Sequence, residues 1–218
     1  MWVNPLFSAD ARSALRVLAT AETLATLVVE APLRAAHLPL LFEERDDDRM
    51  VLIGHIPRVD PLAAAITTGQ RVLCVFHGPR AYVSGGWYGD TPGLSTYNFS
   101  VAHVSGPAEP MRDRAELRSH LVDLIDFHER RKQPADGGPW ALDARAQGRI
   151  DELLPAVIGF RILVDEAQAK QKIGQNRTPE DRASTIAHLE RSPQEEHRDI
   201  ARAMRDAEDG SAPRRAGH

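Results

Sequence analysis

The stretch FHGPRAYVSGGWY, residues 76–88, says more about the fold than any other part of the sequence. Residues typical of strands flank Gly78-Pro79, a dipeptide typical of turns, so the pattern predicts a hairpin with strands over 71–77 and 81–88. Side chains alternate between the two faces of a strand, and many in this segment are polar or aromatic. These are His77, Arg80, Tyr82, Ser84, Trp87 and Tyr88. We therefore expect the hairpin to line a binding site as well as a core.

Short strands also dominate the rest of the chain. They are expected over 25–31, 36–43, 50–56, 95–108, 156–164 and 169–173. Helices are expected over 8–20, 60–68 and 113–132, in a short segment before Pro155, and from Thr178 and from Ser192 onward. Ser8, Asp60 and Asp113 are the expected N-terminal caps of the first three helices. This order of elements predicts a mainly β protein with helices (α+β), built on a β-barrel.

The chain is expected to contain one principal domain with an appendage. A barrel domain is expected over 1–177, a helical extension over 178–208 and a disordered tail over 209–218. The helix that starts at Ser192 is charged on most faces and lacks a wide apolar stripe. We therefore expect it to be solvated or to face a partner.

The composition is that of an ordinary globular protein. The 218 residues are 42% hydrophobic and 27% charged, and the formal net charge of −4 makes a nucleic-acid partner unlikely. Cys74 is the one cysteine, so no disulfide can form within the chain, and a cytoplasmic location is expected. No signal peptide and no apolar stretch of membrane-spanning length is evident, so no membrane association is expected.

Two segments have side chains suited to an anionic ligand. GHIPRVDP, residues 54–61, places His55 and Arg58 just before an expected helix N-terminus, where free N–H groups favour anions. Asp60 lies in the same segment and would repel a phosphate at close range. Gln175-Asn176-Arg177 follows the last expected strand and could clamp a ligand or satisfy a helix end.

Histidines and one unusual strand complete the set of candidates. His77 could bind a metal or a heme iron, although a single histidine is more often structural. The strand STYNFSVAHV, residues 95–104, would present Tyr97 and His103 on one face and Asn98 on a small, polar opposite face. No dinucleotide, phosphate-loop, nucleophile-elbow or zinc spacing is present.

Together these motifs resemble the PaiB family of flavin-binding negative transcriptional regulators. The matching segments, in order from about residue 1 to 190, are AHLPL (36–40), GHIPRVDP, FHGPRAYVSGGWY, STYNF with VAHVSG, VIGF (157–160), and QNR followed by Asp181. The resemblance implies an FMN-binding split β-barrel that forms a homodimer, with the cofactor at the subunit interface. It places His55 and Arg58 in the cofactor-binding turn, and Tyr88, Asn98 and Arg177 in matching motifs.

The sequence departs from the family pattern at a few positions, and each of them lies in one of these motifs. Asp60 stands where the family has Asn, Gly85-Gly86 lacks a proline, Tyr97 replaces Trp, and Gly174 replaces Ser. Changes confined to the motifs suggest the same fold with a different ligand. A branch of this fold that the chain resembles is the heme-dependent piperazate synthases, which form an N–N bond by cyclising N5-hydroxyornithine to piperazic acid.

This resemblance leads to a hypothesis of heme b as cofactor and a small amino-acid substrate. His77 would be the axial iron ligand, with His55 next and His103 third, and Arg58 would pair with a propionate. Arg80 would hold the substrate carboxylate, and Tyr88 or Tyr97 would transfer protons. The residues expected to bind the cofactor are His55, Arg58, His77, Tyr82, Trp87, Asn98, His103, Gln175, Asn176 and Arg177. One alternative is a PaiB-like FMN-binding regulator, and another is a non-catalytic barrel without a cofactor.

Overall fold

The structure, a computed structural model, describes residues 1–89 and 93–208. Its strands in this part of the chain are β1 Ser8–Ala9, β2 Leu24–Val29, β3 Arg34–Pro39, β4 Leu41–Glu44, β5 Met50–Pro57, β6 Arg71–Val83, β7 Thr96–Pro110, β8 Val157–Val164 and β9 Glu166–Lys172. The α-helices are α1 Ala11–Ala21, α2 Ala63–Thr67, α3 Arg114–Glu129, α4 Ala144–Leu153, α5 Pro179–Glu190 and α6 Glu195–Glu208. The expected tail lies outside the described residues. None of the described helices is long and apolar enough to cross a membrane.

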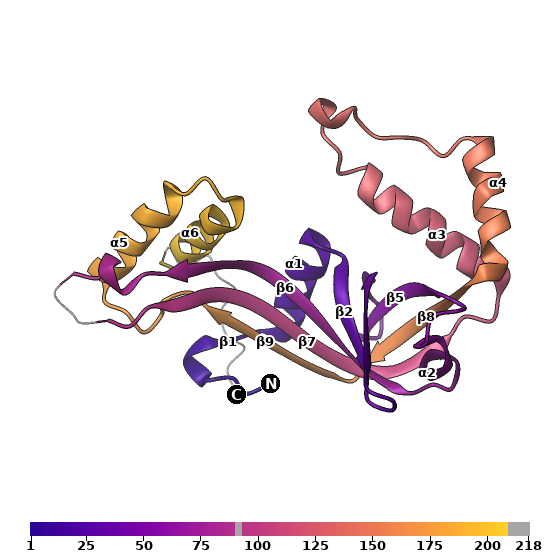
Figure 1. The fold of residues 1–218 in the computed structure, drawn as a ribbon, viewed down its shortest axis with the longest axis horizontal. Coiled ribbons are helices and arrows are strands. Elements are labelled where there is room, and N and C mark those ends of the chain that lie inside the picture. Colours follow the sequence, from indigo (N-terminus) through magenta and orange to yellow (C-terminus); the bar gives the residue numbers. More distant parts are fainter. Residues whose placement is uncertain (90–92, 209–218) are drawn as a thin grey trace. The chain divides into compact units, whose positions relative to one another are not determined.

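The described strands form one sheet (Figure 1), in the order β3-β2-β6-β7-β8-β5-β4, with β9 pairing β7 and the short β1. The β1–β9, β2–β3, β4–β5, β5–β8 and β7–β8 pairs are antiparallel, and β5 pairs with β8 from Met50 opposite Val164 to Pro57 opposite Val157. This architecture confirms the prediction of a mainly β protein with helices. The strand expected over 36–43 is two strands, because the backbone N–H of Leu40 bonds to Thr23 O, 2.8 Å away.

The predicted hairpin around Gly78-Pro79 is wrong, because β6 runs without a turn from Arg71 to Val83. The buried positions of this strand change from even to odd numbers across Gly78-Pro79. A Cβ on Gly78 would lie 2.5 Å from Leu18 Cδ2 and 3.0 Å from Ser100 Cβ, so a larger residue here would force these neighbours to shift. The Gly-Pro pair therefore marks a change of the buried face of one strand.

The chain divides into two compact units. Unit 1 contains Met1–Glu22, Val75–His103 and the segment from Ala167 onward, and unit 2 contains Thr23–Cys74 and Val104–Glu166. Strands β6 and β7 each contribute residues to both units. The two units are defined by contacts between residues, and each combines segments that are far apart in the sequence. The expected domain boundary at residue 177 divides the sequence into consecutive segments instead, and it stays a prediction.

Helix α6 belongs to the core of unit 1, which corrects the expectation of a solvated helix. Its residues Ile200, Ala201 and Met204 are buried in one cluster, although the rest of the helix is strongly charged. The other buried members of the cluster are Ala81, Ile173, Ile186 and Leu189. Helices α5 and α6 therefore cover part of the sheet's apolar surface (Figure 1).

Several helix starts differ from the sequence prediction by a few residues. Asp10, and not Ser8, caps α1 by accepting a hydrogen bond from Ser13 N at 2.8 Å. Helix α2 begins later than expected, after Leu62, and Asp60 accepts a hydrogen bond from Leu62 N at 2.8 Å. Asp113 and Thr178 cap α3 and α5 as predicted.

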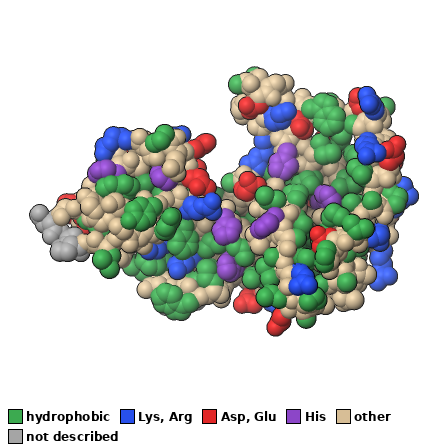
Figure 2. All heavy atoms as spheres, viewed as in Figure 1, with side chains coloured by type: hydrophobic (Ala, Val, Ile, Leu, Met, Phe, Trp, Pro, Cys, Tyr) green, Lys and Arg blue, Asp and Glu red, His purple; other side chains and the backbone are tan. Residues whose placement is uncertain are grey.

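On the face drawn in Figure 2, basic and acidic side chains are interspersed.

Candidate functional site

A small cavity in unit 1 gathers four of the predicted site residues. Its volume is about 160 Å³. The residues that line it are Tyr88, Leu94, Ser95, Thr96, Asn98, Lys172, Gly174, Asn176 and Arg177. They come from the end of the 76–88 motif, the start of β7, the end of β9 and the turn that precedes α5. Segments far apart in the sequence thus meet at one polar site.

Positive charge is concentrated in this cavity. The Arg177 guanidinium lies over the Tyr88 ring, 4.2 Å from its centroid. Lys172 Nζ donates a hydrogen bond to Thr96 Oγ1. The pKa of Lys172 is lowered by burial first, and then by the nearby charges of Lys170 and Arg177. An anion bound here would lower the electrostatic cost of bringing these cations together.

Asn98 contacts helix α6 through its side chain. It is 2% exposed, and its Nδ2 atom donates a weak hydrogen bond to Met204 Sδ at 3.6 Å. The first turn of α5 holds the neighbouring backbone, because Asp181 Oδ1 accepts a hydrogen bond from Gly89 N at 2.9 Å. Both contacts fix the walls of the cavity through the C-terminal helices, so α5 and α6 are structural parts of the site.

The polar side chains of the turn over residues 174–177 have two different roles: one stabilises the turn, and the others line the cavity. Gln175 Oε1 accepts a hydrogen bond from Ile173 N at 2.8 Å, and its Nε2 donates to Gln171 O at 2.6 Å. Gln175 therefore stabilises the turn itself, and Asn176 and Arg177 line the cavity. Gly174 has a φ of +79°, in the left-handed region that favours glycine.

Other predicted residues of unit 1 lie outside this cavity. Trp87 stacks on His188 of α5, with ring centroids 4.9 Å apart and planes 7° apart. Tyr82 and Tyr97 meet edge to face at 5.7 Å and are 48% and 56% exposed. Arg80 is exposed and lies 3.8 Å from Glu196. These three predicted contributors to binding or catalysis, Arg80, Tyr82 and Tyr97, thus lie at the surface of the single chain.

The histidines proposed as iron ligands are distributed over both units. In unit 1, the pKa of His103 is lowered by burial, then by the N-terminal ammonium group, and then by His77. In unit 2, His55 Nδ1 lies 3.1 Å from Nε2 of His120 on α3. The described residues contain no cluster of three or more His, Cys, Asp or Glu arranged to hold a metal ion.

Arg58 of unit 2 binds the backbone of its own unit. Its Nε and Nη2 atoms donate hydrogen bonds to Pro155 O and Val157 O, both at 3.1 Å. It also lines a cavity of about 390 Å³ together with Arg112 and Arg114. Arg58 thus stabilises the start of β8 through Nε and Nη2, so only the remaining part of its guanidinium group is available to a ligand.

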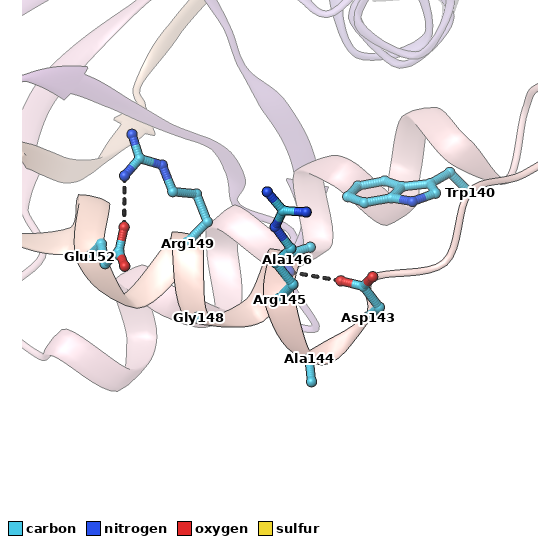
Figure 3. Close-up of a pocket in the computed structure, with 8 residues that line it drawn as sticks. All are labelled: Trp140, Asp143, Ala144, Arg145, Ala146, Gly148, Arg149 and Glu152. Atoms are coloured by element: carbon cyan, nitrogen blue, oxygen red, sulfur yellow. Dashed lines mark hydrogen bonds and ion pairs between the residues drawn. The ribbon is translucent and has the colours of Figure 1, made fainter.

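A larger hollow beside α4 contains none of the predicted site residues (Figure 3). Its volume is about 700 Å³, and it is lined by Trp140, Asp143, Ala144, Arg145, Ala146, Gly148, Arg149 and Glu152. Asp143 accepts a hydrogen bond from Ala146 N at 2.8 Å, and Arg149 pairs with Glu152 at 2.6 Å. Because Asp143 caps α4 and Arg149 is paired with Glu152, and because none of the predicted site residues lies here, we place the candidate site at the smaller cavity of unit 1.

Sequence reasoning missed two polar side chains of the cavity and one histidine that contacts a predicted residue. Thr96 and Lys172 line the cavity, and His120 contacts His55. Thr96 and Lys172 come together only because β9 pairs with β7, a pairing between segments far apart in the chain. His120 carried no local signal, because a single histidine on a helix face is common in structural roles.

Comparison with known proteins identifies the family to which this chain belongs. A family model described as "Putative FMN-binding domain" matches residues 1–166. The chain belongs to this FMN-binding domain family. Protease synthase and sporulation protein PAI 2 of Bacillus subtilis (strain 168), one relative, is 29% identical over 172 residues, which cover 79% of this chain and 80% of the relative.

Two solved structures share the fold of this FMN-binding domain protein at low identity. The FAD and heme binding protein from Mycobacterium smegmatis has a TM-score of 0.54 and 18% identity, covering 81% of this chain and 79% of that chain. The flavocytochrome Anf3 from Azotobacter vinelandii has a TM-score of 0.54 and 16% identity, covering 81% and 75%. The predicted FMN-binding split barrel with C-terminal helices is thereby confirmed, and the homodimer stays a prediction.

Proposed function

We propose that this protein binds FMN and that the cavity of unit 1 receives the anionic phosphate end of the cofactor. The observation that carries this proposal is the pair of cations, Lys172 and Arg177, on the wall of a polar cavity. Membership of the FMN-binding domain family supports the choice of ligand. Arg and Lys are the side chains that most often bind phosphate groups, Arg through a planar fork and Lys as a point charge.

The residues of the cavity fit one part of FMN. Its volume of about 160 Å³ is below the roughly 300–1,000 Å³ typical of pockets that enclose a whole small molecule. The rest of the cofactor would therefore lie against a further surface. A second protomer would supply that surface in the homodimer that the family resemblance implies, and the exposed pair Tyr82 and Tyr97 offers aromatic faces for a flat ring system.

Six of the residues that line the cavity have a definite task in this proposal. Arg177, fixed over the Tyr88 ring, and Lys172, fixed by Thr96, would bind phosphate oxygens. Asn98 and Asn176 would bind polar groups of the ribityl chain. Bound FMN would supply the capacity to accept and donate electrons, and the protein would supply binding and orientation.

The narrower hypothesis, a heme-dependent cyclase that forms the N–N bond of piperazic acid, stays a prediction. It depends on His77 as the axial ligand, and the charge of His77 is the third cause, after burial and the N-terminal ammonium group, that lowers the pKa of His103. One distant structural neighbour is a FAD and heme binding protein and another is a flavocytochrome, and the identity of each with this chain is below 20%. We therefore rank FMN before heme.

An absorption spectrum and a cofactor titration test the proposal. We expect purified protein to bind FMN, with the flavin absorption bands and quenched flavin fluorescence. Arg177→Met and Lys172→Met should each weaken FMN binding about tenfold to a hundredfold, because a charge-assisted hydrogen bond contributes about 1.5–3 kcal/mol. Arg205→Gln, which changes an exposed arginine paired with Glu190 on the same unit, serves as the matched control.

Three outcomes would contradict the proposal. A Soret band that shifts in His77→Ala, without flavin uptake, would favour the heme hypothesis. A colourless protein that takes up neither cofactor would favour the non-catalytic barrel. Unchanged FMN affinity in both Arg177→Met and Lys172→Met would show that the phosphate binds elsewhere.

A further inference from the structure

One cavity of unit 2 combines a wall of arginines with an apolar floor. Its volume of about 390 Å³ falls within the roughly 300–1,000 Å³ typical of pockets that enclose a whole small molecule. It lies where the end of β5, the end of α2, the start of α3 and the start of β8 meet. The residues that line it belong to unit 2, and it shares none of them with the cofactor cavity of unit 1.

Positive charge predominates on the wall of this cavity. Arg58, Arg112 and Arg114 line it, and Asp113 is the one acid among the described residues that do so. Asp113 caps α3, because its Oδ1 atom accepts a hydrogen bond from Ala115 N at 2.8 Å. Three positive charges thus face one negative charge that is already engaged. A cavity with this balance of charge attracts anions.

The three guanidinium groups retain donors for a ligand. Arg58 is anchored through Nε and Nη2, and Arg114 through Nη2, which donates to Asp151 O at 3.2 Å. The carboxylate of Asp151 is engaged elsewhere, by Arg118 at 2.8 Å. Arg112 makes no hydrogen bond or ion pair with another residue in the described part of the chain. Two of the arginines are therefore positioned in advance, and the third is free to bind an anion.

The floor of the cavity selects for an apolar body. It includes Met111, Leu117, Leu154 and Ile158, and of these Leu117 and Leu154 are 7% and 4% exposed. A bare inorganic anion would leave this surface in contact with water, whereas a hydrocarbon or aromatic group would cover it. The start of α3 adds the positive end of a helix dipole on the same side as the arginines.

We propose that this cavity of unit 2 binds a small organic anion, with its carboxylate or phosphate group on Arg112 and Arg114 and its aromatic or branched hydrocarbon body on the apolar floor. This ligand would be bound in addition to FMN. The proposal rests on the lining of the cavity and does not depend on the proposed FMN binding.

Calorimetric titration with four probes separates the contributions of charge and apolar surface. Phenyl phosphate and benzoate carry both a ring and an acidic group, benzyl alcohol carries only the ring, and inorganic phosphate carries only the charge. We expect the tighter of the two aromatic anions to bind at least about tenfold more tightly than benzyl alcohol or inorganic phosphate, with and without FMN. Which of the two binds more tightly distinguishes a phosphate ligand from a carboxylate ligand.

Variants of the two arginines test where the anion binds. Arg112→Gln and Arg114→Gln should each weaken binding of the tighter aromatic anion about tenfold to a hundredfold, the value of a charge-assisted hydrogen bond, and should leave FMN affinity unchanged. Arg130→Gln is the matched control, because Arg130 lies at the other end of α3 and is paired with Asp126. Arg112→Gln removes no contact within the described structure, so it should fold even if Arg114→Gln does not.

Three results would overturn the proposal. These are benzyl alcohol binding as tightly as both aromatic anions, unchanged binding of the tighter anion in Arg112→Gln and Arg114→Gln, and an equal loss in Arg130→Gln. Displacement of the probe by FMN, together with weaker FMN binding in Arg112→Gln, would also overturn it, because the cavity would then hold the cofactor itself. Failure of the wild-type protein to bind FMN would refute the proposed function alone.

Discussion

Acidification should destabilise the folded protein through His120, and the variant His120→Gln should remove this effect. The pKa of His120 is lowered from 6.5 to about 4 by burial and, to a smaller extent, by the charge of His55. Between these two pH values the unfolded chain binds a proton at this position and the folded protein does not. The free energy of unfolding therefore falls as the pH falls from 6.5 to about 4, and the loss is complete below about pH 4.

The size of the effect follows from the two pKa values. At pH 5, a group with a pKa of 6.5 in the unfolded chain and about 4 in the folded protein lowers the free energy of unfolding by about 2 kcal/mol. At pH 7 the contribution is close to zero, because both states are then largely neutral. Glutamine does not titrate, so we expect His120→Gln to lose about 2 kcal/mol less than the wild-type protein between pH 7 and pH 5.

Urea unfolding at pH 7 and at pH 5 provides the assay, with His128→Gln as the control on the same helix. Comparing losses within each protein cancels the contribution of the other titrating groups. The reasoning would be refuted by equal losses in the wild-type protein and His120→Gln. It would also be refuted by a loss in the wild-type protein that appears only below pH 4.

Three further predictions concern packing and reactivity. Met204→Ala should destabilise the protein by about 2–4 kcal/mol, because Met204 is 1% exposed in the core of unit 1, and a change below 1 kcal/mol in urea unfolding would contradict that placement. Gly174→Ser should cost about 1–2 kcal/mol, because a serine at a φ of +79° is strained. Its control, Gly148→Ser, has open space around the new side chain, and an equal cost for both in thermal unfolding would refute the argument. Cys74 is buried, and burial raises the pKa of its thiol, so a thiol reagent should label the protein slowly under native conditions and rapidly in urea. Rapid labelling under native conditions would contradict this prediction, because it would show that strand β6 opens and exposes Cys74.

The strands were predictable from local patterns, because alternation and turn residues act over a few positions. Gly78-Pro79 shows the limit of this reasoning. The same dipeptide that usually makes a turn here lies within β6, where Leu18 and Ser100 approach the backbone of Gly78 closely. Those two residues come from other elements, so no local pattern could reveal the contact.

Helix α6 and the site show the same limit in two other ways. The charges of α6 suggested a solvated helix, yet three small or apolar residues on one face are enough to join the core once Ile186 and Leu189 lie opposite. Of the cavity residues, Tyr88, Asn98, Asn176 and Arg177 were identified from motifs. Lys172 and Thr96 were not, because their contact exists only after β7 and β9, which are far apart in the sequence, have paired.

The division of the chain has a consequence for the order in which the protein can fold during synthesis. All of unit 2 has been made once Glu166 leaves the ribosome, whereas unit 1 still lacks β9, α5 and α6. Strand β1 has to wait for its partner, since Ser8 pairs with Lys170. Pairings between such distant segments form late and slowly. We therefore expect nascent chains to hold a protected unit 2 while the N-terminal helix and the segments that form the cavity of unit 1 are still open to proteases and chaperones.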